Sequence, residues 1–225
     1  MNRETFQLLE GYMRACVRDR AHDENHVLRV LYNALEIAAD EPEADIDVLI
    51  AACLLHDIAR GEEMENPSIR HAAAGAEKAR RFLLENGFAA EFADRVAACI
   101  ALHSYGDAPR PMPEQRILYD ADKLDSAGAL GTARTLMFHG VLGDSLYCLS
   151  ADGAVQDGEA EGKGSYFAQY HGLLKRLPES MLTLAGREMA ARRMEAARQF
   201  YESALLEARQ THQNGAMRLN AALEK

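Results

Sequence analysis

The segment from Ile46 to Ala59 constrains the fold of this chain more than any other. Eleven of its fourteen residues are apolar, and a helix of that composition has no polar face to turn towards water, so it is buried on nearly all sides. His56 and Asp57 stand next to each other at the C-terminal end of this segment. Because an unpaired buried charge is costly, these two side chains need partners, either in an ion pair or around a metal ion.

The rest of the chain is also predicted to be helical. Alanine, leucine, glutamate and arginine dominate, and apolar residues recur every three or four positions, a pattern typical of helices. No segment alternates polar and apolar residues for long enough to predict a half-buried strand, so the predicted fold class is all-α. We expect helices at about 2–19, 24–40, 45–60, 68–86, 89–103, 114–137, 164–176 and 180–212.

Local signals set the expected boundaries. Asp45 is predicted to cap the N-terminus of the buried helix, and Gly61 to end it. The segment that follows, GEEMENPS, is expected to be a solvated loop that includes Glu62 and Glu63. Residues 150–165 hold four glycines and predict a flexible loop inside one domain. We therefore expect a single domain over residues 1–225, with a core at about 20–140 and C-terminal helices at 166–212.

Composition excludes several classes of protein. The net charge of −10 disfavours general binding to nucleic acids, and the absence of tryptophan disfavours a stacking platform for single strands. The longest apolar tract, Val48 to Leu55, has eight residues, too few to cross a membrane. The four cysteines form no CxxC pair and predict reduced thiols. We expect a cytoplasmic protein with no membrane or nucleic-acid partner, and a homo-oligomer is compatible with the sequence.

Polar clusters interrupt the helical pattern. They lie in AHDENHVLRV, in LLHDIAR, in SIRHAAAGAEKA, in CIALHSYGD and in ILYDADKLDSAGALGTAR. The candidate histidines and aspartates among them are His22, His26, His56, Asp57, His71, His103, Asp120, Asp122 and Asp125. A site of two imidazoles and two carboxylates suits manganese, iron, cobalt, nickel, zinc or, less readily, magnesium.

The order His26, His56-Asp57 and Asp122 resembles the HD superfamily of metal-dependent phosphohydrolases. The resemblance is closest to small stand-alone bacterial HD hydrolases, which include nucleoside triphosphate pyrophosphohydrolases. It is carried by HDENHVLRVLYNALEIA, VLIAACLLHDIAR, HAAAGAEKARRFL, IALHS and ILYDADKLDSAGALGTAR. It implies an HD-type helical bundle in which His26, His56, Asp57 and Asp122 hold a divalent metal. Asp120 is the rival for the fourth position, and Asp122 is preferred because it precedes a basic residue.

The resemblance also implies roles for residues near the metal. His71, His103 and Lys123 are expected to be catalytic, by neutralising the charge that develops on a phosphate. Arg29 and Arg60 are expected to bind the phosphorylated substrate. The structural alternatives are two histidines that merely lie at helix ends, arginines that are only solvated, and an exposed Lys123 paired with Asp120 or Asp125. Asp125 is a further candidate, able to hold an imidazole or a water molecule.

Together these features predict a metal-dependent phosphohydrolase. It would cleave a phosphoester or phosphoanhydride bond of a small phosphorylated substrate, a nucleotide, with metal-activated water. One alternative is a binuclear HD-type phosphodiesterase or a di-iron oxygenase, in which His71 and His103 supply extra ligands. Another is a non-catalytic nucleotide-binding module, which the intact ligand set disfavours. The number of metal ions per chain separates the mononuclear from the binuclear class.

Overall fold

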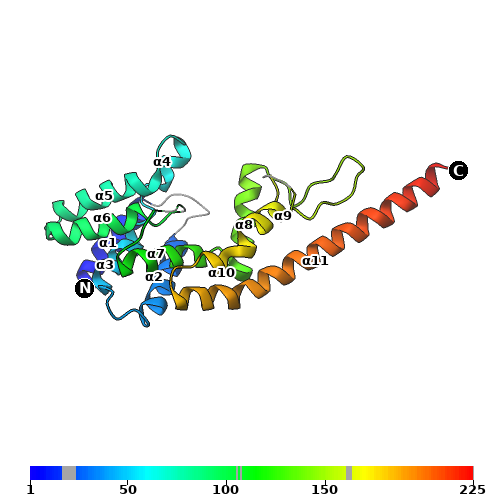
Figure 1. Ribbon diagram of the computed structural model, residues 1–225. Coiled ribbons are helices and arrows are strands. Elements are labelled where there is room, and N and C mark those ends of the chain that lie inside the picture. The colour runs from blue at the N-terminus through cyan, green and yellow to red at the C-terminus, as the bar shows by residue number, and fades with distance from the viewer. Residues whose placement is uncertain (17–23, 105, 107, 161–163, 225) are drawn as a thin grey trace. The chain divides into compact units, whose positions relative to one another are not determined.

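The computed structural model describes residues 1–16, 24–104, 106, 108–160 and 164–224 (Figure 1). Over these residues the regular secondary structure is helical, and β pairing is limited to the isolated bridges Ser145–Ser165 and Leu149–Val155. The all-α prediction is therefore confirmed. The end of the predicted helix 2–19 and His22 lie outside the described residues. The helices are α1 (Arg3–Cys16), α2 (Glu24–Ala38), α3 (Ile46–Leu55), α4 (Arg60–Glu65), α5 (His71–Glu85), α6 (Ala90–Ala101), α7 (Pro113–Leu124), α8 (Gly128–Leu142), α9 (Tyr166–Gly172), the 3-10 helix η1 (Leu174–Arg176), α10 (Leu177–Ser180) and α11 (Leu184–Leu223).

The described chain divides into two compact units. The first comprises Met1–Asp125 with Met181–Arg187, and the second comprises Ser126–Ser180 with Glu188–Lys225. The first unit therefore contains α1 to α7, and the second contains α8 to α10 and most of α11. A single domain over residues 1–225 stays a prediction.

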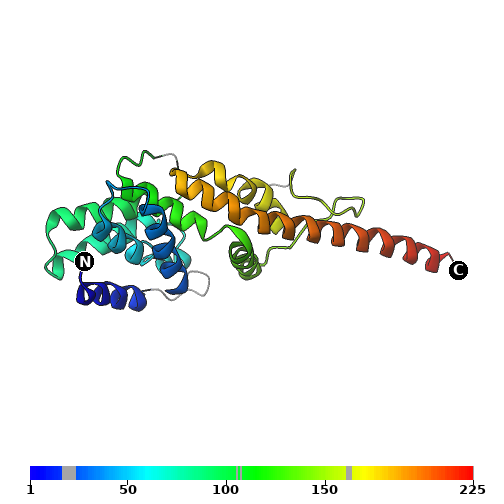
Figure 2. The same ribbon diagram turned by 90° about the horizontal axis from the view of Figure 1, so that it is seen from below.

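Helix α3 is the core of the first unit. Seven of its ten residues are buried, and it contacts α1, α2, α6 and α7. Helices α5 and α6 lie side by side in this unit (Figures 1 and 2). The predicted cap is confirmed, because Asp45 Oδ1 accepts hydrogen bonds from the backbone N–H groups of Asp47 and Val48. The apolar run thus forms the buried helix that the sequence predicts, and its C-terminal end delivers His56 and Asp57.

Replacing Asp45 with alanine is expected to destabilise the fold by about 1 kcal/mol, because the α3 N-terminus loses its cap. Burial opposes ionisation of Asp45, but the hydrogen bonds from Val48 and Arg95 outweigh it and lower the pKa of the carboxyl. A lowered pKa stabilises the folded state above the unfolded pKa of about 4, and this contribution disappears as the pH falls through the folded pKa. Urea unfolding at neutral and at acidic pH measures the effect. A Glu43→Ala control should show none, and an equal loss for Asp45→Ala at both pH values would contradict the assignment.

The predicted helix at 114–137 is wrong in one respect, since the structure has two helices there. Helix α7 ends at Leu124 and α8 begins at Gly128. Gly128 has a φ of +74°, a left-handed conformation that glycine adopts with little strain. Asp125, Ser126 and Gly128 are weak helix formers, but apolar residues continue at three-residue spacing through Leu124, Ala127 and Leu130, so the periodicity does not reveal the break.

The expected end of the buried helix and the loop after it also need correction. Helix α3 ends at Leu55, a four-residue turn follows, and Gly61 lies inside α4. The segment predicted as a solvated loop therefore begins as a short helix that includes Glu62 and Glu63. A glycine inside a helix costs only about 1 kcal/mol relative to alanine, so its presence alone does not end one.

The second unit is held together by aromatic side chains. Tyr170 of α9 stacks on Tyr201 of α11 with ring centroids 4.1 Å apart. In the segment predicted as a flexible loop, Val155 is buried, and the Tyr201 hydroxyl donates to the carbonyl of Asp157 over 2.8 Å. Residues 161–163 of that segment lie outside the described residues, and its flexibility stays a prediction.

Helix α11 is longer than its predicted range, since it continues to Leu223. Among the described residues, no helix is both long and apolar enough to cross a membrane.

Candidate metal centre

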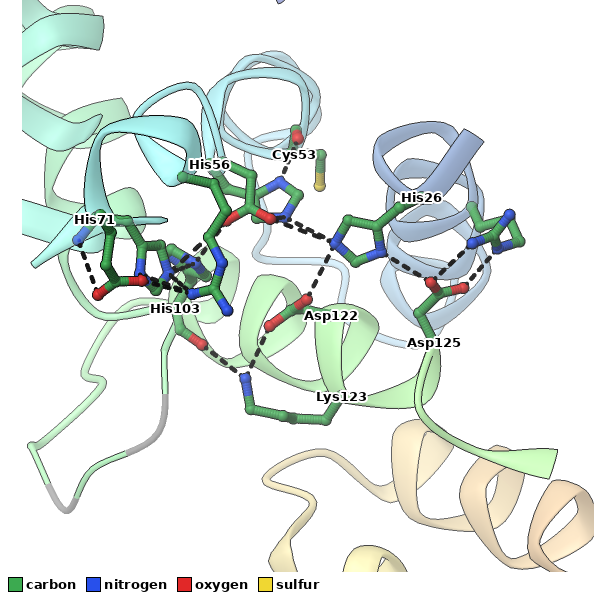
Figure 3. A network of polar contacts seen from close by, with 12 residues as sticks. His26, Cys53, His56, His71, His103, Asp122, Lys123 and Asp125 are labelled. Carbon is green, nitrogen blue, oxygen red and sulfur yellow. Dashed lines mark hydrogen bonds and ion pairs between the residues drawn. The ribbon is translucent and has the colours of Figure 1, made fainter. Parts of the chain in front are cut away.

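The polar residues of the sequence clusters meet at helix ends in the first unit (Figure 3). His26 lies in the first turn of α2, and His71 is the first residue of α5. His56 and Asp57 follow the end of α3, and His103 follows the end of α6. Asp122 lies in the last turn of α7. Helix ends leave backbone N–H and C=O groups without partners in the helix, and here several helix ends lie around one cluster of side chains.

A small residue lets α5 approach this cluster closely. A Cβ atom built on Gly75 would lie 3.3 Å from the carbonyl oxygen of His56 and 3.6 Å from Ile100 Cγ2. Gly75 follows His71 by one helical turn, so both residues face the same way. The absent side chain at Gly75 thus allows the start of α5 to place His71 at the end of α3.

Two of the imidazoles donate to backbone carbonyls. His56 Nδ1 lies 2.8 Å from the carbonyl oxygen of Cys53, and His103 Nδ1 lies 2.7 Å from that of Ile100. A carbonyl oxygen only accepts hydrogen bonds, so the Nδ1 atom of each ring must carry the proton.

The other two imidazoles donate to carboxylates. His26 Nδ1 lies 2.7 Å from Asp125 Oδ2, and His71 Nδ1 lies 2.7 Å from Glu63 Oε2. Both Nδ1 atoms must therefore also carry protons, since two unprotonated acceptors at this distance would repel. All four rings turn their Nε2 atoms towards the centre of the cluster.

Asp57 lies between these four Nε2 atoms. Its Oδ2 atom is 3.6 Å from His26 Nε2 and 3.7 Å from His56 Nε2. Its Oδ1 atom is 3.7 Å from His71 Nε2 and 3.6 Å from His103 Nε2. Each carboxylate oxygen of Asp57 therefore faces one pair of imidazoles.

Of the two candidate aspartates in DAD, Asp122 reaches the cluster. Its Oδ1 atom is 3.5 Å from His26 Nε2. Asp120 instead accepts hydrogen bonds from the backbone N–H groups of Leu182 and Thr183 and from the Thr183 hydroxyl. The carboxylate of Asp120 thus anchors the chain that leads into α11.

Charges in the cluster are strongly coupled. Burial alone would lower the pKa of His26, but hydrogen bonds to Asp125 and Asp57 outweigh it and raise that pKa to about 9. Burial lowers the pKa of His56 to about 4. Burial opposes ionisation of Asp57, but the neighbouring imidazoles outweigh it and hold the pKa of this carboxyl below its usual range. Burial also opposes ionisation of Asp122, but the Lys123 ammonium and the imidazoles hold its pKa below the usual range. At neutral pH the centre therefore holds two carboxylates, a protonated His26 and a neutral His56.

This donor set fits a divalent metal. His56 Nε2 and His26 Nε2 are 3.4 Å apart, and His71 Nε2 and His103 Nε2 are 3.3 Å apart. A cation between nitrogen lone pairs this close would be favourable, and buried carboxylates supply the opposing charge. Among the described residues, two groups have ligand atoms within 4.8 Å of one another: His26, His56 and Asp122, and His56, Asp57 and His103. Imidazole nitrogens and carboxylate oxygens suit first-row transition metals, and binding of such an ion would release the proton of His26.

The predicted catalytic and substrate-binding residues lie at or beside this cluster. His71 and His103 are within it, rather than being isolated helix-terminal residues. The Arg29 guanidinium makes two hydrogen bonds to Asp125, of 2.6 and 3.0 Å, so it supports the partner of His26. Arg60 Nη1 lies 2.8 Å from Glu63 Oε2 and 3.0 Å from His71 Nδ1. A role of either arginine on a substrate stays a prediction.

Lys123 is buried, whereas the structural alternative required an exposed lysine. Its ammonium contacts Asp122. Its ammonium lies 2.7 Å from Asp122 Oδ2 and 3.3 Å from the carbonyl oxygen of His103. The lysine therefore orients Asp122, whose other oxygen faces His26.

Replacing Lys123 with methionine is expected to weaken metal binding about tenfold, because Asp122 loses the hydrogen bond that orients it. Calorimetric titration of the metal-free protein with Mn²⁺ measures the change. A Lys78→Met variant, which removes an ammonium that pairs with Glu62, serves as the control. Unchanged metal affinity with a large loss of kcat/KM would instead place Lys123 on the substrate phosphate.

Glu63 is the member of the cluster that the sequence did not reveal. Eight residues separate it from His71, a distance without a local helical or turn signal. The short helix α4 brings the two together, and that helix was itself missed. Asp125, by contrast, was a candidate from the sequence, and it holds the imidazole of His26.

The first unit is all-helical, and its buried His/Asp centre has donors that fit a divalent metal. The sequence pattern of the HD domain matches residues 24–127, which include every member of the cluster. The chain is 33% identical over 185 residues to the uncharacterized protein YpgQ of Bacillus subtilis (strain 168), covering 80% of each chain. It therefore belongs to the HD-domain family.

Solved structures of related proteins have the same fold. The crystal structure of Bacillus subtilis YpgQ in complex with ADP matches with a TM-score of 0.70 and 28% identity, over 90% of this chain and 97% of that one. An HD-superfamily hydrolase from Bacillus thuringiensis matches with a TM-score of 0.68 and 26% identity, over 91% and 96%. A predicted HD-superfamily hydrolase from an uncultured Thermotogales bacterium matches with a TM-score of 0.60 and 29% identity, over 91% of both chains. Hydrolases are thus among the relatives of this chain.

Proposed function

We propose that this protein is a metal-dependent phosphohydrolase that cleaves a phosphoester or phosphoanhydride bond of a nucleotide. The observation that carries the proposal is the convergence of four imidazole Nε2 atoms and the carboxylate of Asp122 around Asp57. The ADP complex of YpgQ supports the choice of a nucleotide as the substrate. We also expect the protein to act in the cytoplasm on small molecules.

In this proposal His26, His56, Asp57 and Asp122 hold the metal. A divalent ion held there would lower the pKa of a water molecule and polarise a phosphoryl oxygen. The ligand residues are fixed before the ion arrives, because each imidazole is held through Nδ1 and Asp122 is held through Lys123. Such a fixed donor set has little reorganisation to undergo during the reaction.

His71 and His103 supply the proton chemistry. Because their Nδ1 atoms donate to Glu63 and to the Ile100 carbonyl, their neutral rings present a lone pair at Nε2. These Nε2 atoms therefore accept a proton from attacking water more readily than they donate one to a phosphate. The positive charge for the phosphate would then come from Arg60, whose guanidinium lies beside His71.

The experiment is a screen of nucleoside mono-, di- and triphosphates with Mn²⁺, Co²⁺, Ni²⁺, Zn²⁺ or Mg²⁺, with the products identified by chromatography. The proposal predicts that at least one metal supports turnover of a nucleotide and that a chelator abolishes it. No turnover of any nucleotide with any of these metals, while ADP still binds, would favour the non-catalytic module.

A second candidate function is that of a binuclear HD enzyme, either a phosphodiesterase or a di-iron oxygenase. The observation that favours it is the position of Asp57 Oδ1, which faces His71 Nε2 and His103 Nε2 at 3.7 and 3.6 Å. A carboxylate with an imidazole pair on each side has donors for two cations. Metal analysis of the loaded protein separates the two functions, since the mononuclear hydrolase requires one ion per chain and the binuclear enzyme two.

A further inference from the structure

The four imidazoles of the centre differ in where they find a hydrogen-bond acceptor. His56 and His103 lie at the C-terminal ends of α3 and α6, and each donates to the carbonyl three residues before it. The last carbonyls of a helix have no partner within it, so such acceptors are available there. His26 and His71 lie at helix N-termini, where the free backbone groups are N–H donors. Those two rings therefore need a carboxylate from elsewhere in the chain.

Glu63 supplies this carboxylate for His71. Its Oε2 atom lies 2.7 Å from His71 Nδ1, and its Oε1 atom accepts from the backbone N–H of His71 over 3.4 Å. Both oxygens of the carboxylate thus bind the same residue, one at the ring and one at the start of α5.

Arg60 makes this arrangement sensitive to the presence of Glu63. Its Nη1 atom lies 2.8 Å from Glu63 Oε2, and it is closer to His71 Nδ1, at 3.0 Å, than to His71 Nε2, at 3.4 Å. While Glu63 accepts the proton of Nδ1, the guanidinium pairs with the carboxylate. Without Glu63, the guanidinium would donate to Nδ1 instead, and the neutral ring would then carry its proton on Nε2.

The position of that proton decides what His71 can do. Its Nε2 atom is 3.7 Å from Asp57 Oδ1 and 3.3 Å from His103 Nε2. With the proton on Nδ1, Nε2 directs a lone pair into the centre. With the proton on Nε2, the ring directs an N–H group there and can neither accept a proton nor bind a cation.

We propose that Glu63 is a positioning residue that fixes the tautomer of His71, so that the Nε2 lone pair faces the metal centre. This inference deepens the proposed function, and its expected effect on the rate of hydrolysis rests on that function. Helix α4 then belongs to the site, because it carries Glu63, the partner of His71.

The first test reads the tautomer directly. Long-range proton–nitrogen correlation spectra of the histidine rings are recorded at about pH 8, above the ordinary imidazole pKa, on metal-free protein. The wild type is expected to show the His71 proton on Nδ1, and Glu63→Ala is expected to move it to Nε2. Glu63→Gln keeps an acceptor oxygen and should keep the wild-type tautomer. Glu62→Ala is the matched control, because Glu62 is the neighbouring glutamate of α4 and pairs with Lys78.

The second test measures nucleotide hydrolysis by the same variants. Glu63→Ala is expected to lower kcat roughly ten- to a hundredfold, as is usual when a supporting carboxylate is removed, with KM nearly unchanged. Glu63→Gln should recover most of the loss, and Glu62→Ala should show none. A Glu63→Ala protein that keeps the proton on Nδ1, or that moves it without any loss of kcat, overturns the proposal. If the wild type hydrolyses no nucleotide, the proposed function fails, and the spectra still decide the role of Glu63.

Discussion

Replacing Asp57 with asparagine is expected to abolish metal binding and hydrolysis together. Asp57 is the residue that all four imidazole Nε2 atoms of the centre share, at 3.6 to 3.7 Å. Asparagine has nearly the same shape but no negative charge, so the centre loses the carboxylate that opposes the cation. The loss of metal affinity should exceed roughly a hundredfold, the upper range for residues that only support a ligand.

Metal content by mass spectrometry and turnover of the nucleotide identified in the screen measure this result. Circular dichroism should show an unchanged helical spectrum, since the amide can donate to the unprotonated Nε2 atoms. Asp94→Asn is the control, because Asp94 is an exposed aspartate that pairs with Arg80. An Asp57→Asn protein that loses activity but keeps full metal occupancy would make Asp57 a purely catalytic residue.

Exchanging the two aspartates of DAD for asparagine, one at a time, is expected to give opposite results. Asp122→Asn should lose metal binding and activity, because its Oδ1 atom faces His26 Nε2 at 3.5 Å. Asp120→Asn should keep both but destabilise the fold by roughly 1–3 kcal/mol. The new amide would place a donor against the N–H groups of Leu182 and Thr183, which now donate to the carboxylate.

Each variant serves as the control for the other, since the two residues are two positions apart on α7. Metal titration and urea unfolding of both proteins give the four values needed. If Asp120→Asn loses the metal and Asp122→Asn keeps it, the assignment of the fourth ligand is reversed.

The sequence predicted the parts of the structure that depend on local patterns. The apolar run before His56 could only be a buried helix, and Asp45 has the side chain and position of an N-cap. The resemblance of the polar clusters to the HD superfamily predicted a centre that includes His26 and Asp57, and the structure brings these residues together. The break between α7 and α8 was missed because the apolar spacing of a helix continues past Gly128.

Other features depend on contacts between segments that no local pattern encodes. Asp120 and Asp122 have the same chemistry, and only the rotation of α7 against its neighbours decides which one faces the centre. Glu63 looked like a solvated glutamate because the short helix α4, which brings it to His71, was not predicted. Lys123 looked equally suited to the surface or to a phosphate until its burial beside Asp122 was visible.

The most direct test of the metal centre is an anomalous difference map from crystals of the protein loaded with Mn²⁺. The account predicts a peak bounded by His26, His56, Asp57 and Asp122, with ligand distances of about 2.0–2.3 Å. A second peak on the His71 and His103 side of Asp57 would assign the protein to the binuclear class. The absence of any peak among these residues in fully loaded crystals would contradict the central claim that they form a metal centre.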